Sequence, residues 1–251
     1  MKSEERRERI YNILKSNKEI SVSALAEQFG VSAMTIRRDL NSLEHSNLVN
    51  RSYGKAHIID ESRQEFSFQQ RSQVNRPLKQ KIAQAALAYL TDISSFYVDG
   101  STTATEVLKI LPSGRTYTVF TNSFEALKLL SEKPWIRTYA IGGFLGKDHN
   151  TFDDGTTIDI VKQIYVDATI TSCSGFSQNG IFNDGITGTQ IKRIMLANSA
   201  QNFILADHTK ANSQGLFLLS SWESLHYLIT DAPIDAKCLE TVKSFGVQVR
   251  W

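Results

Sequence analysis

SVSALAEQFG at residues 21–30 is followed directly by VSAMTIRRDL at residues 31–40, and these two segments decide the fold of the first part of the chain. Each segment spaces its apolar residues as one face of a helix. Gly30 lies between them, where a tight turn often needs a positive φ. Ser21 and Ser32 stand where a side-chain oxygen can cap each helix. The pattern predicts two short helices joined by a turn.

The second of these helices is predicted to have two different sides. Ile36, Leu40 and Leu43 fall on one apolar stripe, and polar or basic residues fall on the sides and front. Such a helix can rest on a core and place its front in the major groove of DNA. A solvated helical hairpin is the alternative, but caps, turn, stripe and basic front all favour DNA binding. The residues expected to contact DNA are Ser32, Met34, Thr35, Arg37, Arg38 and Asn41.

The flanking segments extend this prediction. A helix from Glu4 to about Leu14 is expected to turn Ile10, Ile13 and Leu14 inward and to leave Arg6, Arg7 and Arg9 outside. Residues 48–58 indicate a hairpin with Gly54 near its tip and Arg51, Tyr53, Lys55 and His57 on one face. A basic hairpin after a DNA-reading helix is a wing that contacts phosphate or the minor groove, so Arg51 and Lys55 are further candidates.

These motifs resemble the N-terminal winged helix of the DeoR family of bacterial sugar-metabolism regulators. The family hallmark is a small residue or Ser followed by Thr-apolar-Arg-basic-Asp-apolar. The chain matches it with Ser32, Thr35, Ile36, Arg37, Arg38, Asp39 and Leu40. The resemblance implies a transcriptional regulator that binds a double-stranded DNA operator, and it places Arg7, Ile10 and Leu14 in the first helix of the signature.

Length and composition fit two domains. The chain has 251 residues, of which 41% are hydrophobic. Residues 1–58 hold ten Lys and Arg against seven Asp and Glu, a net charge of +3, whereas the remainder holds 18 against 19, a net charge of −1. We expect a winged helix-turn-helix domain at residues 1–58, a linker at 59–77 and an α/β effector-sensing and oligomerisation domain at 78–251.

The composition also argues against several classes of protein. No apolar run is long enough to cross a membrane, and the charged start MKSEERRERI does not resemble a signal peptide, so we expect a cytoplasmic protein. Cys173 and Cys238 are far apart and have no neighbours with metal-ligand spacing. We therefore interpret them as reduced core thiols and expect neither a metal nor a cofactor.

Strand and helix patterns alternate from residue 78 onward, after Pro77 and a helix that begins near Leu78. This alternation predicts a mostly parallel sheet covered by helices on both faces. The expected strands are Ser95–Val98, Tyr117–Phe120, Thr138–Ile141, Ala168–Ile170, Phe203–Leu205, Tyr227–Ile229 and Val247–Val249. The expected helices are Thr103–Leu111, Ser123–Ser131, Thr157–Gln163, Thr187–Ala200 and Asp235–Ser244.

Small polar residues follow the first three strands, at the edge where such folds bind ligands. In the loop Asp99, Gly100, Ser101, Thr102 and Thr103, a glycine, three hydroxyls and a helix start suit an anion. The loop has no lysine of its own, so it is not a nucleotide P-loop. Taken alone, Thr121, Asn122 and Ser123 are better explained as an ordinary helix cap. Gly142 and Gly143 follow the third strand.

The resemblance to the DeoR family continues through this second part. It implies a sensor domain related to ribose-5-phosphate isomerase, whose phosphate loop, second motif and third motif match residues 99–103, 121–123 and 142–143. Lys192 resembles the family's lysine segment, and Leu205–Lys210 resembles its Leu-Ala-Asp-x-x-Lys motif. Asp207 and Lys210 are therefore candidate effector contacts, and a solvated position for Lys192 and Lys210 is the alternative.

The chain departs from the family at two carboxylates. Residues 187–190 read TGTQ where an acidic residue is common, and residues 172–175 read SCSG where relatives often have Gly-Ala-Asp-Gly. Asp184 is a candidate replacement in space. The departures leave the phosphate loop in place and argue against an isomerase, because aldose–ketose isomerisation needs a carboxylate base.

Two functions follow from these observations. The first is a regulator, expected to repress carbohydrate-metabolism genes under the control of a phosphorylated sugar. The alternative is a sugar-phosphate isomerase-like enzyme with an appended DNA-binding head, with Asp99 or Asp184 as its base. A regulator is expected to be a homo-oligomer, a dimer or a tetramer, because one short helix and a wing contact too few bases for genomic specificity.

Overall fold

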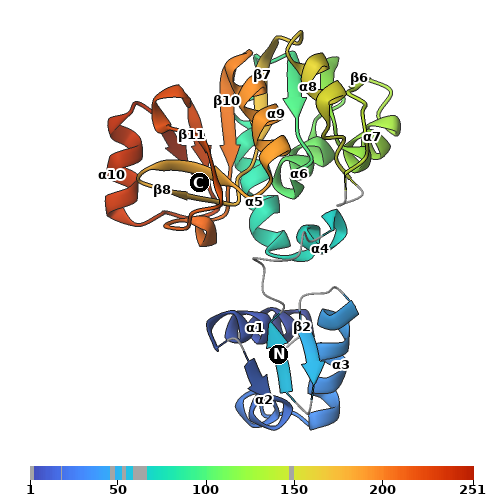
Figure 1. The fold of residues 1–251 in the computed structure, drawn as a ribbon, viewed down its shortest axis with the longest axis vertical. Helices are drawn as coiled ribbons and strands as arrows, with labels where there is room; N and C mark the ends of the chain where they lie inside the picture. The colour runs from blue at the N-terminus through green and yellow to red at the C-terminus, as the bar shows by residue number, and fades with distance from the viewer. Residues whose placement is uncertain (1–2, 18, 46–48, 53–54, 59–66, 147–149) are drawn as a thin grey trace. The chain divides into compact units, whose positions relative to one another are not determined.

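The computed structural model describes residues 3–17, 19–45, 49–52, 55–58, 67–146 and 150–251. These residues belong to two compact units, Met1–Val74 and Asn75–Trp251. Figure 1 shows both units, and each is described by itself. Among the helices in the described ranges, none is both long and apolar enough to cross a membrane.

Three helices build the core of the first unit: α1 (Ser3–Asn17), α2 (Val22–Phe29) and α3 (Ala33–His45). Gly30 ends α2 with φ of +62°, and the Ser21 hydroxyl accepts the Ala24 N–H at its start, so the predicted turn and cap are confirmed. The helices pack through side chains that are fully buried, namely Ile10, Leu14, Leu25, Ile36 and Leu40.

A small antiparallel sheet completes the first unit. Its strands are β1 (Glu19–Ser21), β2 (Val49–Ser52) and β3 (Lys55–Ile58), in the order β1-β3-β2. The predicted hairpin after α3 is confirmed, and β1 is an addition that the sequence did not predict. Tyr53 and the expected tip residue Gly54 lie outside the described residues.

The prediction that Arg6 faces outward is wrong. Arg6 is only 6% exposed, and its Nε donates to Asp39 Oδ2 on α3 over 2.6 Å. Arg6 stands four residues before Ile10 and eight before Leu14, so helical spacing puts it on their inward face. The prediction relied on its charge instead, and Asp39 on α3 supplies the buried carboxylate that allows the guanidinium to lie there. Arg9 is exposed as expected and pairs with Glu5.

The segment expected as a linker contains helical structure in its described part. Ser67 and Gln70 form a reciprocal capping box at the start of α4 (Phe68–Gln73). Helix α5 (Arg76–Leu87) begins two residues before the predicted Leu78, with Pro77 in its first turn. Residues 59–66 lie outside the described ranges.

The second unit is built on a seven-stranded sheet in which every neighbouring pair is parallel. The strand order is β13-β12-β10-β7-β4-β5-β6. The strands are β4 (Ser95–Val98), β5 (Tyr117–Thr121), β6 (Ile136–Ala140), β7 (Val166–Thr171), β10 (Ser199–Leu205), β12 (Tyr227–Ile229) and β13 (Gln248–Arg250).

Helices cover both faces of this sheet, as predicted (Figure 1). Residues of α5, α6 and α7 pack with Phe96 and Val98 of β4, whereas residues of α8 and α9 pack with Tyr97, which points to the opposite face. The helices that follow α5 are α6 (Thr102–Ile110), α7 (Phe124–Ser131), α8 (Gly155–Val161), α9 (Ile186–Ala197) and α10 (Ala236–Ser244).

A second, antiparallel sheet was not predicted. It contains β8 (Gly175–Ser177), β9 (Gly180–Asn183) and β11 (Phe217–Ser220) in the order β11-β9-β8. Two 3-10 turns, His208–Lys210 and Trp222–Ser224, lie in the same half of the chain. The predicted fold class, a winged helix followed by a mostly parallel α/β sheet, is nevertheless confirmed.

The sheet changes direction at β4. From β4 the chain adds β5 and β6 on one side, and it then returns to place β7 on the other side. The loops that leave β4 and β7 therefore diverge at the carboxyl edge of the sheet. Ligands of open α/β sheets bind at such a switch point.

Candidate functional sites

The exposed side of α3 has four side chains in one helical stripe. Met34 is 71% exposed, and Arg37, Arg38 and Asn41 are also exposed. Their spacing of three, four and seven residues puts them on one face, opposite the buried Ile36. The structure thus brings these four candidate DNA contacts together.

Ser32 and Thr35 have a local structural role at the start of α3. The Ser32 hydroxyl accepts the Thr35 N–H over 3.2 Å, and the two hydroxyls lie 3.0 Å apart. This is the cap that the sequence predicted. Ser32 remains exposed beside the stripe, whereas Thr35 is half-buried.

Asp39 fixes α3 against α1 through the buried pair with Arg6. A structural role for this aspartate was not predicted from the sequence. The sequence did indicate such a role. A carboxylate on a helix that faces DNA would repel phosphate, so Asp39 is expected to face the protein interior.

The two wing candidates differ in what the structure shows of them. Lys55 Nζ lies 2.7 Å from Glu19 Oε1, and both side chains are about half exposed. An exposed pair of this kind contributes at most about 1 kcal/mol, so the ammonium can exchange its partner for a phosphate. Arg51 lies on β2, and its side chain is outside the described part of the structure.

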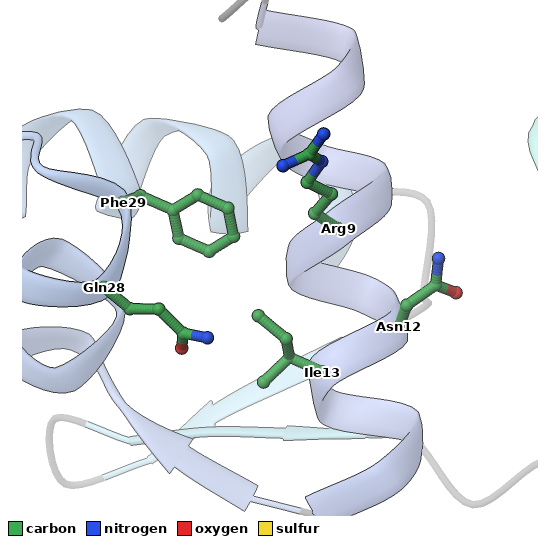
Figure 2. Close-up of a pocket in the computed structure, with 5 residues that line it drawn as sticks. All are labelled: Arg9, Asn12, Ile13, Gln28 and Phe29. Carbon is green, nitrogen blue, oxygen red and sulfur yellow. The ribbon is translucent and has the colours of Figure 1, made fainter.

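The first unit also has an open hollow between α1 and α2. Figure 2 shows the side chains of Ile13 and Phe29 on opposite sides of it, with Arg9, Asn12 and Gln28 also lining it. None of these residues was a site candidate, and Arg9 Nη2 is paired with Glu5 over 2.9 Å.

The loop 99–103 lies at the switch point of the sheet, between β4 and α6. Gly100 is required there, because a Cβ at this position would lie 2.1 Å from Thr151 Cγ2. The glycine thus allows the loop that contains Asn150 and Thr151 to pack closely against the loop 99–103. Asn150 holds the two loops together by donating from Nδ2 to the Gly100 carbonyl over 3.2 Å.

The hydroxyl residues of this loop differ in their hydrogen bonding. The Ser101 hydroxyl donates to Asp99 Oδ1 over 2.7 Å and accepts the Ala104 N–H, so it is occupied. In the described part of the chain, the backbone N–H groups and hydroxyls of Thr102 and Thr103 have no hydrogen-bond partner. These donors stand at the first two positions of α6, where the helix dipole favours an anion.

Two lysines from distant segments meet beside this loop. Lys192 Nζ on α9 lies 2.9 Å from Asp99 Oδ2 and donates to the Ser172 carbonyl. Lys210 Nζ donates to the Cys173 carbonyl over 2.7 Å and to the Ser172 hydroxyl over 3.3 Å. The Lys192 side chain is 12% exposed, which excludes the solvated alternative for this residue.

Asp207 lies at the end of β10, next to these groups in the fold. It is 1% exposed, and its Oδ1 accepts from Asn75 Nδ2 over 3.4 Å and from the Thr209 hydroxyl. Asn75 adopts φ of +52°, a left-handed conformation that asparagine tolerates. Asn75 and Ser172 are site neighbours that the sequence analysis missed.

The loop 121–123 uses its polar groups for the fold. Asn122 accepts from the Tyr97 hydroxyl and donates to the Phe152 carbonyl, both over 2.8 Å. The Ser123 hydroxyl donates to Asn150 Oδ1 and accepts the Ala126 N–H, and the Thr121 hydroxyl accepts the Ser123 N–H. These contacts support the interpretation as a helix cap.

The last three effector candidates have local partners away from the lysines. The Gly142 carbonyl accepts from the Thr157 hydroxyl. A Cβ on Gly143 would lie 2.3 Å from the Oγ1 atom of Thr157. Asp184 is exposed, and its Oδ1 accepts the Leu216 N–H. It does not replace the missing carboxylate in contact with Lys192, and Asn183 Oδ1 lies 3.4 Å from the Lys192 ammonium instead.

Burial determines the state of the cysteines. Burial raises the pKa of the Cys173 thiol, and the nearby ammonium groups of Lys210 and Lys192 only partly oppose this effect. Burial also raises the pKa of the Cys238 thiol to about 11. Both cysteines are free and buried, so both are neutral thiols of the core. In the ranges that the structure describes, no cluster of His, Cys, Asp or Glu could hold a metal ion.

Known proteins resemble the chain along almost its whole length. The DeoR-like helix-turn-helix domain matches residues 6–62, and the DeoR C terminal sensor domain matches residues 74–232. The chain is 32% identical over 246 residues to the HTH-type transcriptional regulator YulB of Bacillus subtilis (strain 168), which covers 98% of this chain and 95% of YulB.

A second relative is the HTH-type transcriptional repressor GlcR of the same organism. It is 30% identical over 239 residues, which covers 95% of this chain and 92% of GlcR. Among solved structures, ribose 5-phosphate isomerase A of Methanocaldococcus jannaschii matches with a TM-score of 0.39, 19% identity and 55% of each chain covered.

Proposed function

The chain belongs to the DeoR family of transcriptional regulators, and on that premise we propose that it represses carbohydrate-metabolism genes under the control of a phosphorylated sugar that binds its second unit. The proposal is carried by one observation in each unit. In the first unit it is the exposed stripe on α3, and in the second it is the start of α6, where the donors of Thr102 and Thr103 have no partner in the described part of the chain.

The donors at Thr102 and Thr103 favour an anion over a neutral sugar. Backbone N–H groups and hydroxyls at a helix start suit a phosphate, whose oxygens all accept hydrogen bonds. Lys210 adds positive charge, because no carboxylate in the described residues forms an ion pair with it. Lys192 is different, since Asp99 already neutralises it. We therefore place the phosphate at the start of α6, with the sugar extending toward Lys210.

The same contacts disfavour an isomerase. Two carboxylates are candidates for the base. Asp99 forms an ion pair with Lys192 and accepts from the Ser101 hydroxyl, and Asp184 accepts from the Leu216 N–H. A proton-transfer base must reach the carbon-bound proton of its substrate. We propose that the site binds without turnover.

The regulator is proposed to act in the cytoplasm as a homo-oligomer. One stripe of four side chains and a wing read only a few base pairs. Two heads on one assembly raise the effective concentration of the second head at its half-site. Light scattering of the protein with and without operator DNA measures this directly, and a monomer in both samples would contradict it.

Thr102→Asp tests the effector site. The new carboxylate would lie at the first position of α6 and repel a phosphate, while the first unit is untouched. We expect this variant to bind the operator normally and to ignore the effector. Phe124→Asp is the control for a new carboxylate at a helix start, because Phe124 is the first residue of the neighbouring α7. Thr102 is 7% exposed and Phe124 is 49% exposed, so the urea denaturation of both variants is measured as well.

Calorimetry provides the readout. A panel of pentose and hexose phosphates is compared with the unphosphorylated parent sugars on the wild-type protein and both variants. The proposal requires that phosphate increases affinity in the wild-type protein and in Phe124→Asp, but not in Thr102→Asp. Equal affinity for sugar and sugar phosphate would exclude the phosphate site and leave the DNA-binding unit unaffected.

A further inference from the structure

Met34 is an exposed apolar side chain that the fold does not explain. At 71% exposure it is the only large hydrophobic residue classed as exposed among the described residues of the first unit. The other apolar residues of α3, Ile36, Leu40 and Leu43, are 0%, 0% and 6% exposed. A single exposed hydrophobic residue is common on protein surfaces, so it is the place of Met34 on α3 that bears on its function.

The position of Met34 points to the DNA complex. It lies one turn before Arg37 and Arg38 and two turns before Asn41, on the same face of the helix. In helix-turn-helix proteins the N-terminal residues of the second helix contact base edges in the major groove. Met34 is the second residue of α3, so it belongs to that end. This step rests on the proposed DNA-binding function.

The chemistry of the side chain then selects a base. A thioether has no hydrogen-bond donor and is a weak acceptor, so it cannot distinguish the polar edges of guanine, adenine or cytosine. The C5-methyl group of thymine is the apolar feature of the unmodified major groove. Met is unbranched and flexible, so it can follow a methyl group at a groove wall. We infer that Met34 makes each operator half-site select a thymine through contact with its C5-methyl group.

The expected effect is small and measurable. Removing one buried methyl-sized group weakens binding by about 0.8 kcal/mol, or about fourfold, for each half-site. A dimer on two half-sites would lose roughly 15-fold if the two effects add. A phosphate contact would behave differently, because its loss changes the dependence of affinity on salt.

The experiment uses uracil, which differs from thymine only by this methyl group. The full-length protein first selects its operator from a random duplex library. Each thymine of the half-site is then replaced by uracil, one position at a time, and affinity is measured for wild type, Met34→Ala and Met34→Leu. We expect one position where wild type and Met34→Leu lose about fourfold, whereas Met34→Ala loses nothing.

The possible results separate this inference from the function on which it rests. If wild type and Met34→Ala lose the same affinity at every position, or if no position responds to uracil, the thymine contact is wrong while DNA binding stands. If Met34→Ala changes the mass in light scattering and keeps the uracil response, Met34 is a subunit contact instead. If no operator is selected, the proposed function and the inference both fail. Circular dichroism and an unchanged salt slope confirm that Met34→Ala is folded and keeps its phosphate contacts.

Discussion

The loops 99–103 and 121–123 follow neighbouring parallel strands, and each contains a serine that caps the next helix. Ser101 accepts the Ala104 N–H, and Ser123 accepts the Ala126 N–H. The difference lies in the other polar groups. The Asn122 side chain accepts from Tyr97 and donates to Phe152, so both of its polar atoms have partners, whereas Thr102 has donors without partners in the described structure.

This comparison shows what separates a ligand site from a helix start. A serine caps the following helix at both loops, so a cap indicates a junction between a strand and a helix and does not indicate a ligand site. A site needs donors that the fold leaves unused, together with charge from elsewhere in the chain. Lys210 supplies that charge beside residues 99–103, where Asp99 neutralises Lys192, and no lysine in the described residues is paired with residues 121–123.

The largest expected loss of stability comes from removing the lysine that pairs with the loop 99–103. Lys192→Met leaves the Asp99 carboxylate, 3% exposed, without its cation. Breaking such a buried pair costs roughly 3–5 kcal/mol of unfolding free energy. Tryptophan fluorescence in urea measures it for the second unit alone, because Trp135, Trp222 and Trp251 all lie there. Lys128→Met on the exposed side of α7 is the control, and a loss below about 1 kcal/mol for Lys192→Met would contradict the pairing.

Asn122→Ala tests the other loop. The substitution leaves the hydroxyl of the fully buried Tyr97 without its hydrogen-bond acceptor. We expect this to lower the free energy of unfolding by about 1–3 kcal/mol. Binding of inorganic phosphate, followed by calorimetry, should stay unchanged. Adding Tyr97→Phe removes the stranded hydroxyl and should restore part of the stability. A loss of phosphate binding in Asn122→Ala would place this loop in the ligand site after all.

Matched cap substitutions sharpen the comparison. Ser101→Ala and Ser123→Ala each remove one cap and should each cost about 1 kcal/mol in urea denaturation. Only Ser101→Ala should weaken phosphate binding, because it also leaves Asp99 Oδ1 without the hydroxyl donor that partly offsets the negative charge of this carboxylate near the anion. Equal phosphate affinities in the two variants would show that the loops do not differ in this way.

The smallest effect concerns the third junction, where Asp154 caps α8 beside Gly143. The Thr157 N–H donates to its carboxylate over 3.0 Å, and this bond lowers the pKa of Asp154 below its ordinary value. The charged cap therefore stabilises the protein above the unfolded-state pKa of about 3.9, and this contribution is lost as pH falls through the lower folded-state value.

Asp154→Asn keeps a cap without the charge. We expect the stability difference between wild type and this variant to be present near about pH 6 and to shrink below about pH 4. Thermal melts across that range measure it. A difference that does not change with pH would mean that the charge of Asp154 does not contribute.

The parallel sheet was predictable because strands such as β4, β7 and β12 are largely buried on both faces. Such strands are continuous apolar, β-branched runs, and Ser95–Val98 and Tyr227–Ile229 were predicted with the bounds that the structure has. Helix starts were predictable for a local reason. Ser123 and Asp235 cap the residues that follow them in the chain, which sequence alone shows.

The prediction was weaker where distant residues decide the structure. Ser199 and Ala200 continue a helical pattern, but they begin β10 because they pair with β7. The strands β8 and β9 are only three or four residues long and have no apolar run to indicate them. Strand β11 does lie on an apolar run, residues 216–219, which was not interpreted as a strand. Helix α9 was correctly expected to contain Lys192, yet its partner Asp99 lies far away in the chain.

Asn150 illustrates the same limit within the site. It is fully buried, donates to the Gly100 carbonyl and accepts from Ser123, and so it ties the two compared loops together. Its local sequence contains nothing that distinguishes it from a surface loop asparagine. A residue whose partners are all remote in sequence is found only once the fold is known.

The pair between Arg6 and Asp39 has a practical consequence for preparing the protein. A truncated form that starts after Arg6 would keep the apolar residues Ile10 and Leu14 but leave Asp39, 1% exposed, without its cation. Proteolytic trimming of the first few residues could therefore loosen the DNA-reading helix without cutting it. A loss of operator binding on storage should therefore first be checked by mass spectrometry, which shows whether Arg6 is still present.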